Sequence, residues 1–201
     1  AEKHFRRAIE LNPSYSTAHH WFALALAAMG KHEESIEQID RAVLLEPRSA
    51  VIYSAAGLVY YFAHRYDDAL KMCRKSLEID PRFVPAYKTI RVIHEAAGNY
   101  AEAAEAYEKE RNFSGNADED TPGWEMITAQ VRSVGGLRAE AAESVKKAVS
   151  STVVRENPRG YSNEIAIAYA LLGDKKNALE WIAKAKDYKD HGFNFINVDP
   201  R

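Results

Sequence analysis

Hydrophobic and polar positions follow a paired pattern along the chain. The stretch 16–29 contains no Asp, Glu, Lys or Arg, whereas the stretch 32–45 that follows is dense in charged residues. Apolar residues three and four positions apart predict helices, and gaps of two to four residues predict that paired helices lie antiparallel. The same pairing predicts further helices at 50–63 and 66–79, and at 84–97 and 100–111.

A repeat of 34 residues underlies this pairing. Pro13, Pro47 and Pro81 stand 34 residues apart, and they close the similar phrases AIELNP, AVLLEP and SLEIDP. Each proline is expected to end a helix, because proline donates no backbone N–H and its ring clashes with the preceding turn. Internal repetition at this period is typical of helical arrays in which stacked pairs share one continuous core.

The turns and crossings of the predicted helix pairs follow the same period. Gly30 and Gly98 lie two periods apart, where C-capping glycines are expected. His64 fills the position between them, although histidine tolerates a left-handed backbone less well than glycine. Small residues also recur where two helices would need to approach closely. These crossing residues are Ala23 and Ser35 in one pair, and Gly57 and Ala69 in the next.

This pattern resembles the tetratricopeptide repeat (TPR) family. Its repeats have a large residue early in the first helix (helix A), small residues where helix A crosses the second helix (helix B), and a closing proline. The matching residues of 16–49 are Phe22, Ala23, Leu26, Ser35, Ile39, Ala42 and Pro47. Those of 50–83 are Tyr53, Gly57, Tyr60, Ala69, Cys73, Ser76 and Pro81. The resemblance implies an all-α fold, a right-handed α-solenoid of helix-turn-helix repeats.

The resemblance organises the chain as one solenoid over 1–201, with two irregularities. The chain opens on a lone helix B, so we expect that an upstream segment of a longer protein has been removed. Gly115 stands where the third repeat would have its proline. The expected segments are a half repeat (1–15), repeats (16–49, 50–83, 84–111), a loop (112–120), a degenerate repeat (121–150), a repeat (159–188) and a tail (189–201).

Two charged residues occupy positions that the other repeats give to small ones. Arg91 stands at the position of Ala23 and Gly57, and Glu110 at that of Ala42. One hypothesis is a partly buried ion pair between Arg91 and Glu110 that replaces the crossing of small residues. The alternative is that both side chains turn to solvent.

The family geometry implies a partner-binding groove, because helix A lines the inside of a TPR superhelix. An apolar floor is expected from Leu24, Leu58 and Val92, with Tyr61 as an interface anchor. Packing of helix A against its neighbours explains most of its apolar character without any partner. The implied groove residues are His20, Leu24, Ala27, Ser54, Leu58, Tyr61, Lys88, Val92 and Glu95.

Composition and motifs exclude several classes of function. The 27 Lys and Arg against 29 Asp and Glu give a net charge of −2, which argues against a protein that coats nucleic acid or an anionic membrane. One cysteine excludes an intrachain disulfide and a cysteine-based zinc site. The sequence shows no catalytic constellation, metal-ligand spacing or phosphate-binding loop. We therefore expect no enzymatic activity, catalytic residue, metal or cofactor.

The sequence thus favours a scaffold that binds a peptide or helix of a protein partner in its groove, with no nucleic-acid or membrane partner. The closing repeat resembles those of bacterial multidomain TPR proteins, which leaves a second hypothesis. The array would then be the regulatory or sensory arm of a larger signalling protein (kinase, cyclase or transcription regulator) and would act on its own chain. Self-association through exposed solenoid ends is a third. With no signal segment and no apolar run of roughly 18–20 residues, a cytoplasmic location is expected.

Overall fold

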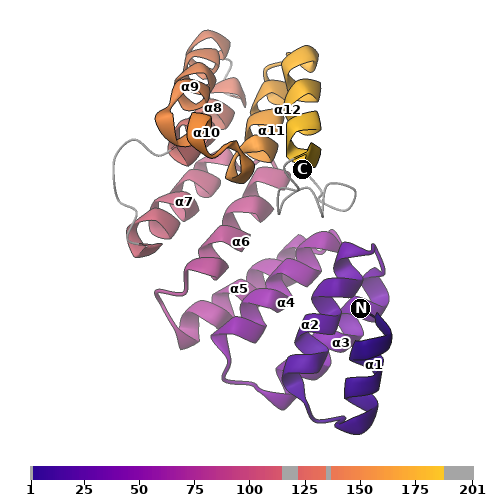
Figure 1. The fold of residues 1–201 in the computed structure, drawn as a ribbon. Coiled ribbons are helices and arrows are strands. Elements are labelled where there is room, and N and C mark those ends of the chain that lie inside the picture. The colour runs from indigo at the N-terminus through magenta and orange to yellow at the C-terminus, as the bar shows by residue number, and fades with distance from the viewer. Residues whose placement is uncertain (1, 115–121, 135–136, 188–201) are drawn as a thin grey trace. The chain divides into compact units, whose positions relative to one another are not determined.

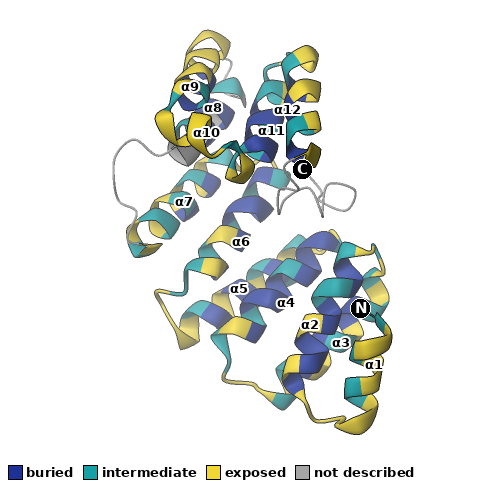
Figure 2. Cartoon of the chain, in the orientation of Figure 1, coloured by how far each residue is buried: buried dark blue, intermediate teal, exposed yellow. Residues whose placement is uncertain are grey.

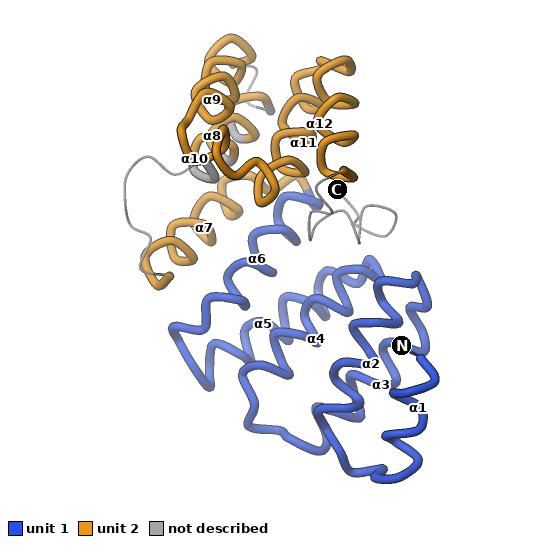
Figure 3. The backbone as a smooth tube through the Cα atoms, in the orientation of Figure 1, with its two compact units in different colours: residues 1–97, 198–200 blue, residues 98–197, 201 orange. Residues whose placement is uncertain are grey.

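The computed structural model describes residues 2–114, 122–134 and 137–187, and every regular element within them is a helix. These residues form two compact units, which divide between Ala97 and Gly98 (Figure 3). Unit 1 comprises residues 2–97 and unit 2 comprises residues 98–187 of those described.

Unit 1 is a layered array of six helices (Figure 1). The A helices α2, α4 and α6 lie side by side, α3 packs against α2 and α4, and α5 packs against α4 and α6. The predicted helices agree with these elements to within one residue at each end. Their bounds are α1 Glu2–Leu11, α2 Ser16–Ala28, α3 His32–Leu45, α4 Ala50–Phe62, α5 Tyr66–Ile79 and α6 Val84–Ala96.

Close helix crossings in unit 1 depend on the small residues that the repeat predicts. Ala23 and Ser35 are fully buried, and the Ser35 hydroxyl donates a hydrogen bond to the Ala23 carbonyl at 2.7 Å. In the next pair, a Cβ added at Gly57 would overlap the Cys73 sulfur and lie 3.2 Å from the Ala69 carbonyl oxygen. The predicted role of small residues at these crossings is therefore confirmed.

Unit 2 repeats the paired arrangement less regularly. The helix α8 pairs with α9 and α11 pairs with α12, while α7 packs against α8. The unit has a core to which α8, α9, α11 and α12 contribute, including Met126, Val145, Ile165 and Trp181. Its elements are α7 Tyr100–Ser114, α8 Pro122–Val134, α9 Arg138–Ser150, α10 Thr152–Glu156, the 3-10 helix Pro158–Gly160, α11 Ser162–Leu171 and α12 Lys175–Asp187.

The structure corrects two sequence expectations in unit 2. Residues 112–114 continue α7, although the sequence suggested a loop over 112–120. Residues 151–158, which the sequence suggested as a linker between the degenerate repeat and the last repeat, contain α10. This helix begins where the Ser151 hydroxyl accepts a hydrogen bond from the Val154 N–H at 3.3 Å. Val154 is buried in the core, which fixes this short helix. Residues 115–120 of the expected loop, Gly115 among them, lie outside the described residues. The predicted tail 189–201 also lies outside them.

Candidate partner-binding surface

Two A helices of unit 1 carry exposed apolar side chains. Trp21 on α2 is 54% exposed and Val51 on α4 is 50% exposed. Leu24 lies three residues after Trp21, and Leu58 lies seven residues after Val51, so each half-buried leucine shares a helix side with the exposed residue. With Thr17, one turn before Trp21, these residues are here named the α2–α4 face.

The arrangement of the B helices explains why this face is open. Because α3 packs against both α2 and α4, and α5 packs against α4 and α6, the B helices cover one side of the A-helix layer. Figure 2 shows α2 and α4 as largely buried or intermediate, with few exposed positions. Trp21, Leu24, Val51 and Leu58 thus stand out as apolar side chains that the other helices of unit 1 do not cover fully.

The indole of Trp21 rests on an adjacent ring. The His20 and Trp21 rings stack with centroids 4.8 Å apart and an interplanar angle of 26°. Burial lowers the pKa of His20 below its usual value, and the carboxylate of Glu46 opposes that shift. The imidazole is therefore neutral near pH 7, and it adds no charge beside the α2–α4 face.

Most of the groove residues inferred from the family pattern are buried. Tyr61 is 1% exposed, and its ring packs against Phe62 and Tyr66 with centroids 5.2 and 6.1 Å away. Such residues offer little surface to a partner, so their part in binding remains a prediction. The buried residues are His20, Ala27, Ser54, Tyr61, Val92 and Glu95; Leu24 and Leu58 are half-buried, and Lys88 is exposed.

Glu95 has a structural contact that the sequence did not suggest. It pairs with Arg91 one turn earlier on α6, with Nη1 and Oε1 2.5 Å apart and with both side chains buried. A buried pair of opposite charges holds both groups in place, because removal of either would leave an uncompensated charge. The pair predicted from the sequence, Arg91 with Glu110, involves residues of different units and remains a hypothesis.

Trp21 and Val51 were not among the groove residues chosen from the family pattern. Helical spacing alone could have found them, since each shares a helix side with a residue that was chosen. What spacing cannot supply is the depth of each side chain, which depends on the size of its neighbours. In the structure, Tyr61 is buried and Trp21 is about half exposed, so Trp21 is the more accessible of the two aromatic side chains.

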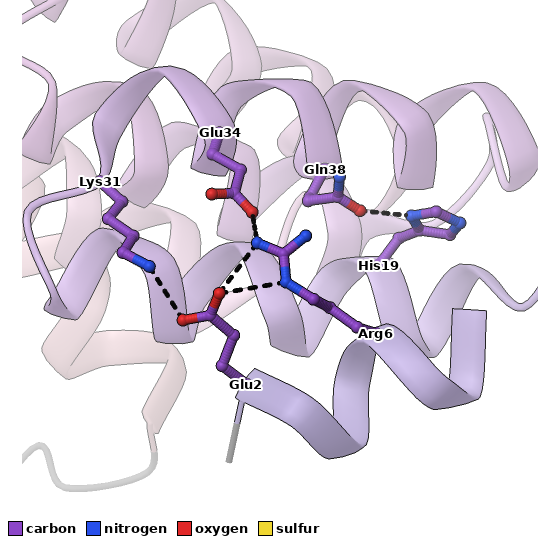
Figure 4. Close-up of polar contacts among 6 residues, drawn as sticks. All are labelled: Glu2, Arg6, His19, Lys31, Glu34 and Gln38. Atoms are coloured by element: carbon purple, nitrogen blue, oxygen red, sulfur yellow. Dashed lines mark hydrogen bonds and ion pairs between the residues drawn. The ribbon is translucent and has the colours of Figure 1, made fainter. Parts of the chain in front are cut away.

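A polar network fastens α1 to the first helix pair (Figure 4). Glu2 accepts from Arg6 at 2.9 Å and from Lys31 at 2.9 Å, and Arg6 also pairs with Glu34 on α3. Hydrogen bonds from Lys31 and then Arg6 lower the pKa of the Glu2 carboxyl. The Arg6 guanidinium lies 5.1 Å from the centre of the Phe22 ring. These exposed ion pairs are worth little individually, and together they link α1 to α3 and to the turn before it.

The described residues contain no cluster of three or more histidine, cysteine, aspartate or glutamate side chains that could hold a metal ion. No helix among them is long and apolar enough to cross a membrane.

Comparison with protein families identifies the repeat. A family model described as tetratricopeptide repeat matches residues 1–43 and 22–82. Residues 1–82 therefore belong to the tetratricopeptide repeat family. Beyond them, the helix pairs α8–α9 and α11–α12 have the same paired arrangement. No curated protein sequence matches the chain.

Solved structures show the same fold at low sequence identity. A tetratricopeptide repeat protein from Parabacteroides merdae has a TM-score of 0.65 at 17% identity, over 94% of this chain and 72% of that one. MamA has a TM-score of 0.60 at 18% identity, over 78% and 84%. YrrB, described as a TPR protein with an unusual peptide-binding site, has a TM-score of 0.55 at 20% identity, over 97% of each chain. They confirm the predicted class, an all-α solenoid of helix-turn-helix repeats.

Proposed function

We propose that this protein is a non-catalytic scaffold and that its α2–α4 face binds a segment of a protein partner. The observation that carries the proposal is the exposed Trp21 side chain on an uncharged face of an otherwise well-packed helix layer. Tryptophan is enriched among the few residues that dominate binding energy at protein interfaces. The peptide-binding site described for YrrB, which has a similar fold, also supports this proposal.

The family geometry extends the proposed site toward α6. Since α4 packs against both α2 and α6, a partner large enough to reach beyond the α2–α4 face would also meet the exposed Lys88 on α6. Affinity would come mainly from burial of apolar area, at roughly 25 cal/mol per Å², less the cost of ordering the partner. Lys88 would contribute orientation more than affinity.

The first test compares two exposed substitutions on different sides of the same helix pair. Trp21→Ser removes the indole from the α2–α4 face, whereas Leu44→Ser removes a residue that is 73% exposed on the B helix α3. Immobilised wild-type and variant chains are used to capture partners, which are read by mass spectrometry and then purified for affinity measurement. We expect Trp21→Ser to weaken the captured complex at least tenfold and Leu44→Ser to leave it within twofold.

Thermal unfolding of both variants controls for loss of the fold. Because both side chains are about half exposed or more, each midpoint should stay close to the wild-type value. Equal affinity of the Trp21→Ser and wild-type chains for every purified partner would contradict the proposed function.

A further inference from the structure

The polarity of the α2–α4 face constrains the conformation of whatever binds there, an inference that rests on the proposed function. Among the exposed and half-exposed members of this face, Leu24, Val51 and Leu58 are hydrocarbon. The only polar groups that this face presents are the Thr17 hydroxyl and the Trp21 indole N–H. The face therefore offers few hydrogen-bond partners to a bound chain.

An extended peptide would fit such a surface poorly. Its backbone N–H and C=O groups have no partners within the segment, and burying them against hydrocarbon costs free energy unless the receptor supplies hydrogen bonds. A helix satisfies its interior backbone groups internally and presents only side chains. The shortage of polar groups on the α2–α4 face therefore favours a helical ligand.

Spacing along α4 is compatible with the same ligand. Val51 and Leu58 are seven residues apart, which is about 10 Å along a helix at 1.5 Å per residue. Apolar residues at positions i and i+7 of a partner helix have the same separation, and those at i+3 and i+4 fall between them. A helix lying along this face could thus place successive apolar residues against Val51 and Leu58.

Charge indicates which face of the helix would bind. No residue from 16 to 30 or from 49 to 63 is Asp, Glu, Lys or Arg. An uncharged receptor surface gives no compensation for a charge that loses its water on binding. The complementary ligand surface is therefore an uncharged apolar stripe.

We propose that the partner segment recognised by the α2–α4 face is an amphipathic α-helix that docks through an uncharged stripe of apolar residues at i, i+3, i+4 and i+7. Its contacts centre on Trp21 and Leu24 of α2 and on Val51 and Leu58 of α4. Recognition depends on apolar burial and on the helical state of the ligand, with little dependence on salt.

A selection from random peptides tests this inference and does not require the partner to be identified first. The probe is a phage-displayed library of random 16-residue peptides, selected against the intact 201-residue chain. Enriched peptides are synthesised, and their affinities are measured for the wild type, Trp21→Ser and Leu44→Ser at 50 and 500 mM NaCl. Each peptide is also made with its central residue replaced by proline or, as the matched control, by alanine.

The expected peptides have apolar residues at i, i+3, i+4 and i+7, and circular dichroism shows that they gain helix on binding. Trp21→Ser and central proline each weaken binding at least tenfold, because proline breaks a helix interior. Leu44→Ser, central alanine at a polar position and the change in salt each alter affinity less than twofold.

The alternative outcomes separate this inference from the proposed function. Peptides that depend on Trp21 but have apolar residues at every second position, or that keep their affinity within threefold with central proline, would overturn the helical ligand and leave the scaffold role standing. If no selected peptide loses affinity with Trp21→Ser, the proposed site itself is wrong.

Discussion

The two complete helix pairs of unit 1, α2–α3 and α4–α5, solve the same packing problem with different residues. At the helix A crossing position, the first pair has Ala23 and the second has Gly57. Ala23 is fully buried in the first pair, as are Ser35 and Ile39, whereas in the second pair the Cys73 sulfur occupies the space that a Cβ at Gly57 would need. The repeat therefore requires a small residue at this position of helix A. Whether that residue is alanine or glycine depends on the size of the side chain that helix B places opposite it.

The serine of each pair shows the same exchange. Ser35 in α3 stands at the position of Ala69 in α5, and Ser76 in α5 stands at the position of Ala42 in α3. Both hydroxyls are buried and donate at 2.7 Å to a helix A carbonyl, Ser35 to Ala23 and Ser76 to Ala50. Each pair thus has one buried hydroxyl bond across its crossing, at opposite ends of the contact.

The turns differ in strain more than in shape. In the first pair, Gly30 has φ 72° and its N–H donates to the Ala27 carbonyl; in the second, His64 has φ 59° and its N–H donates to the Tyr61 carbonyl. Both turns close with the helix-capping pattern in which a left-handed residue follows the last turn. Histidine adopts this backbone at a cost that glycine avoids.

The substitution with the largest expected effect is Gly57→Ala. Its Cβ would overlap the Cys73 sulfur and crowd the Ala69 carbonyl, and overpacking costs about 1–3 kcal/mol. Better helix propensity returns up to about 1 kcal/mol, so we expect a net loss of up to about 2 kcal/mol. Urea unfolding followed by circular dichroism measures this change.

Two further variants test whether the loss of stability in Gly57→Ala comes from overlap with Cys73. Gly57→Ala combined with Cys73→Ala should show a favourable coupling of about 1 kcal/mol or more, because the smaller side chain removes the overlap. Ala23→Gly, the reverse change in the first pair, should cost at least about 1 kcal/mol, because helix propensity falls and a fully buried methyl group is lost. A stabilised Gly57→Ala protein would show that the two crossings do not differ in available space.

The next effect in size concerns the exchanged serines. Ser35→Ala and Ser76→Ala should each cost about 1 kcal/mol, because each removes a hydrogen bond from a fully buried hydroxyl. The two losses should agree within about 0.5 kcal/mol, since the bonds have the same length and both serine side chains are fully buried. Losses that differ by more than 1 kcal/mol in denaturant unfolding would mean that the two positions are not equivalent.

The smallest effect is expected at the turn between α4 and α5. His64→Gly should stabilise the protein by about 0.5–1 kcal/mol, because relief of the left-handed backbone outweighs the greater freedom of glycine in the unfolded chain. The matched exchange, Gly30→His, should destabilise by a similar amount. Both changes are measured as shifts of the midpoint of urea unfolding with an unchanged m-value. Equal midpoints for His64→Gly and the wild type would show that the His64 turn is no more strained than the Gly30 turn.

Prediction from the sequence succeeds in unit 1 because local signals coincide there. Prolines at a fixed period, turn residues and apolar spacing mark the same helix ends, which agree with the structure within one residue. It fails at α10 because that helix depends on Val154 entering a core formed by residues distant in the sequence. No local pattern in residues 151–158 contains that information.

The candidate site was less predictable for a related reason. A repeat register states which side of helix A a residue occupies, but exposure depends on the bulk of the surrounding side chains. Tyr61 is covered by the rings of Phe62 and Tyr66, while Trp21 remains half exposed although it stacks on His20. The partner contacts of the residues chosen from the register therefore remain predictions.

The filling of the second crossing by sulfur has a practical consequence. Cys73 is the only cysteine in the sequence, it is fully buried, and burial raises the pKa of its thiol to about 12. A thiol reagent can therefore modify it only when α4 and α5 separate, since both access and the thiolate are absent in the closed pair. The rate at which a reagent labels Cys73 would thus measure how often the α4–α5 pair opens transiently in the native protein.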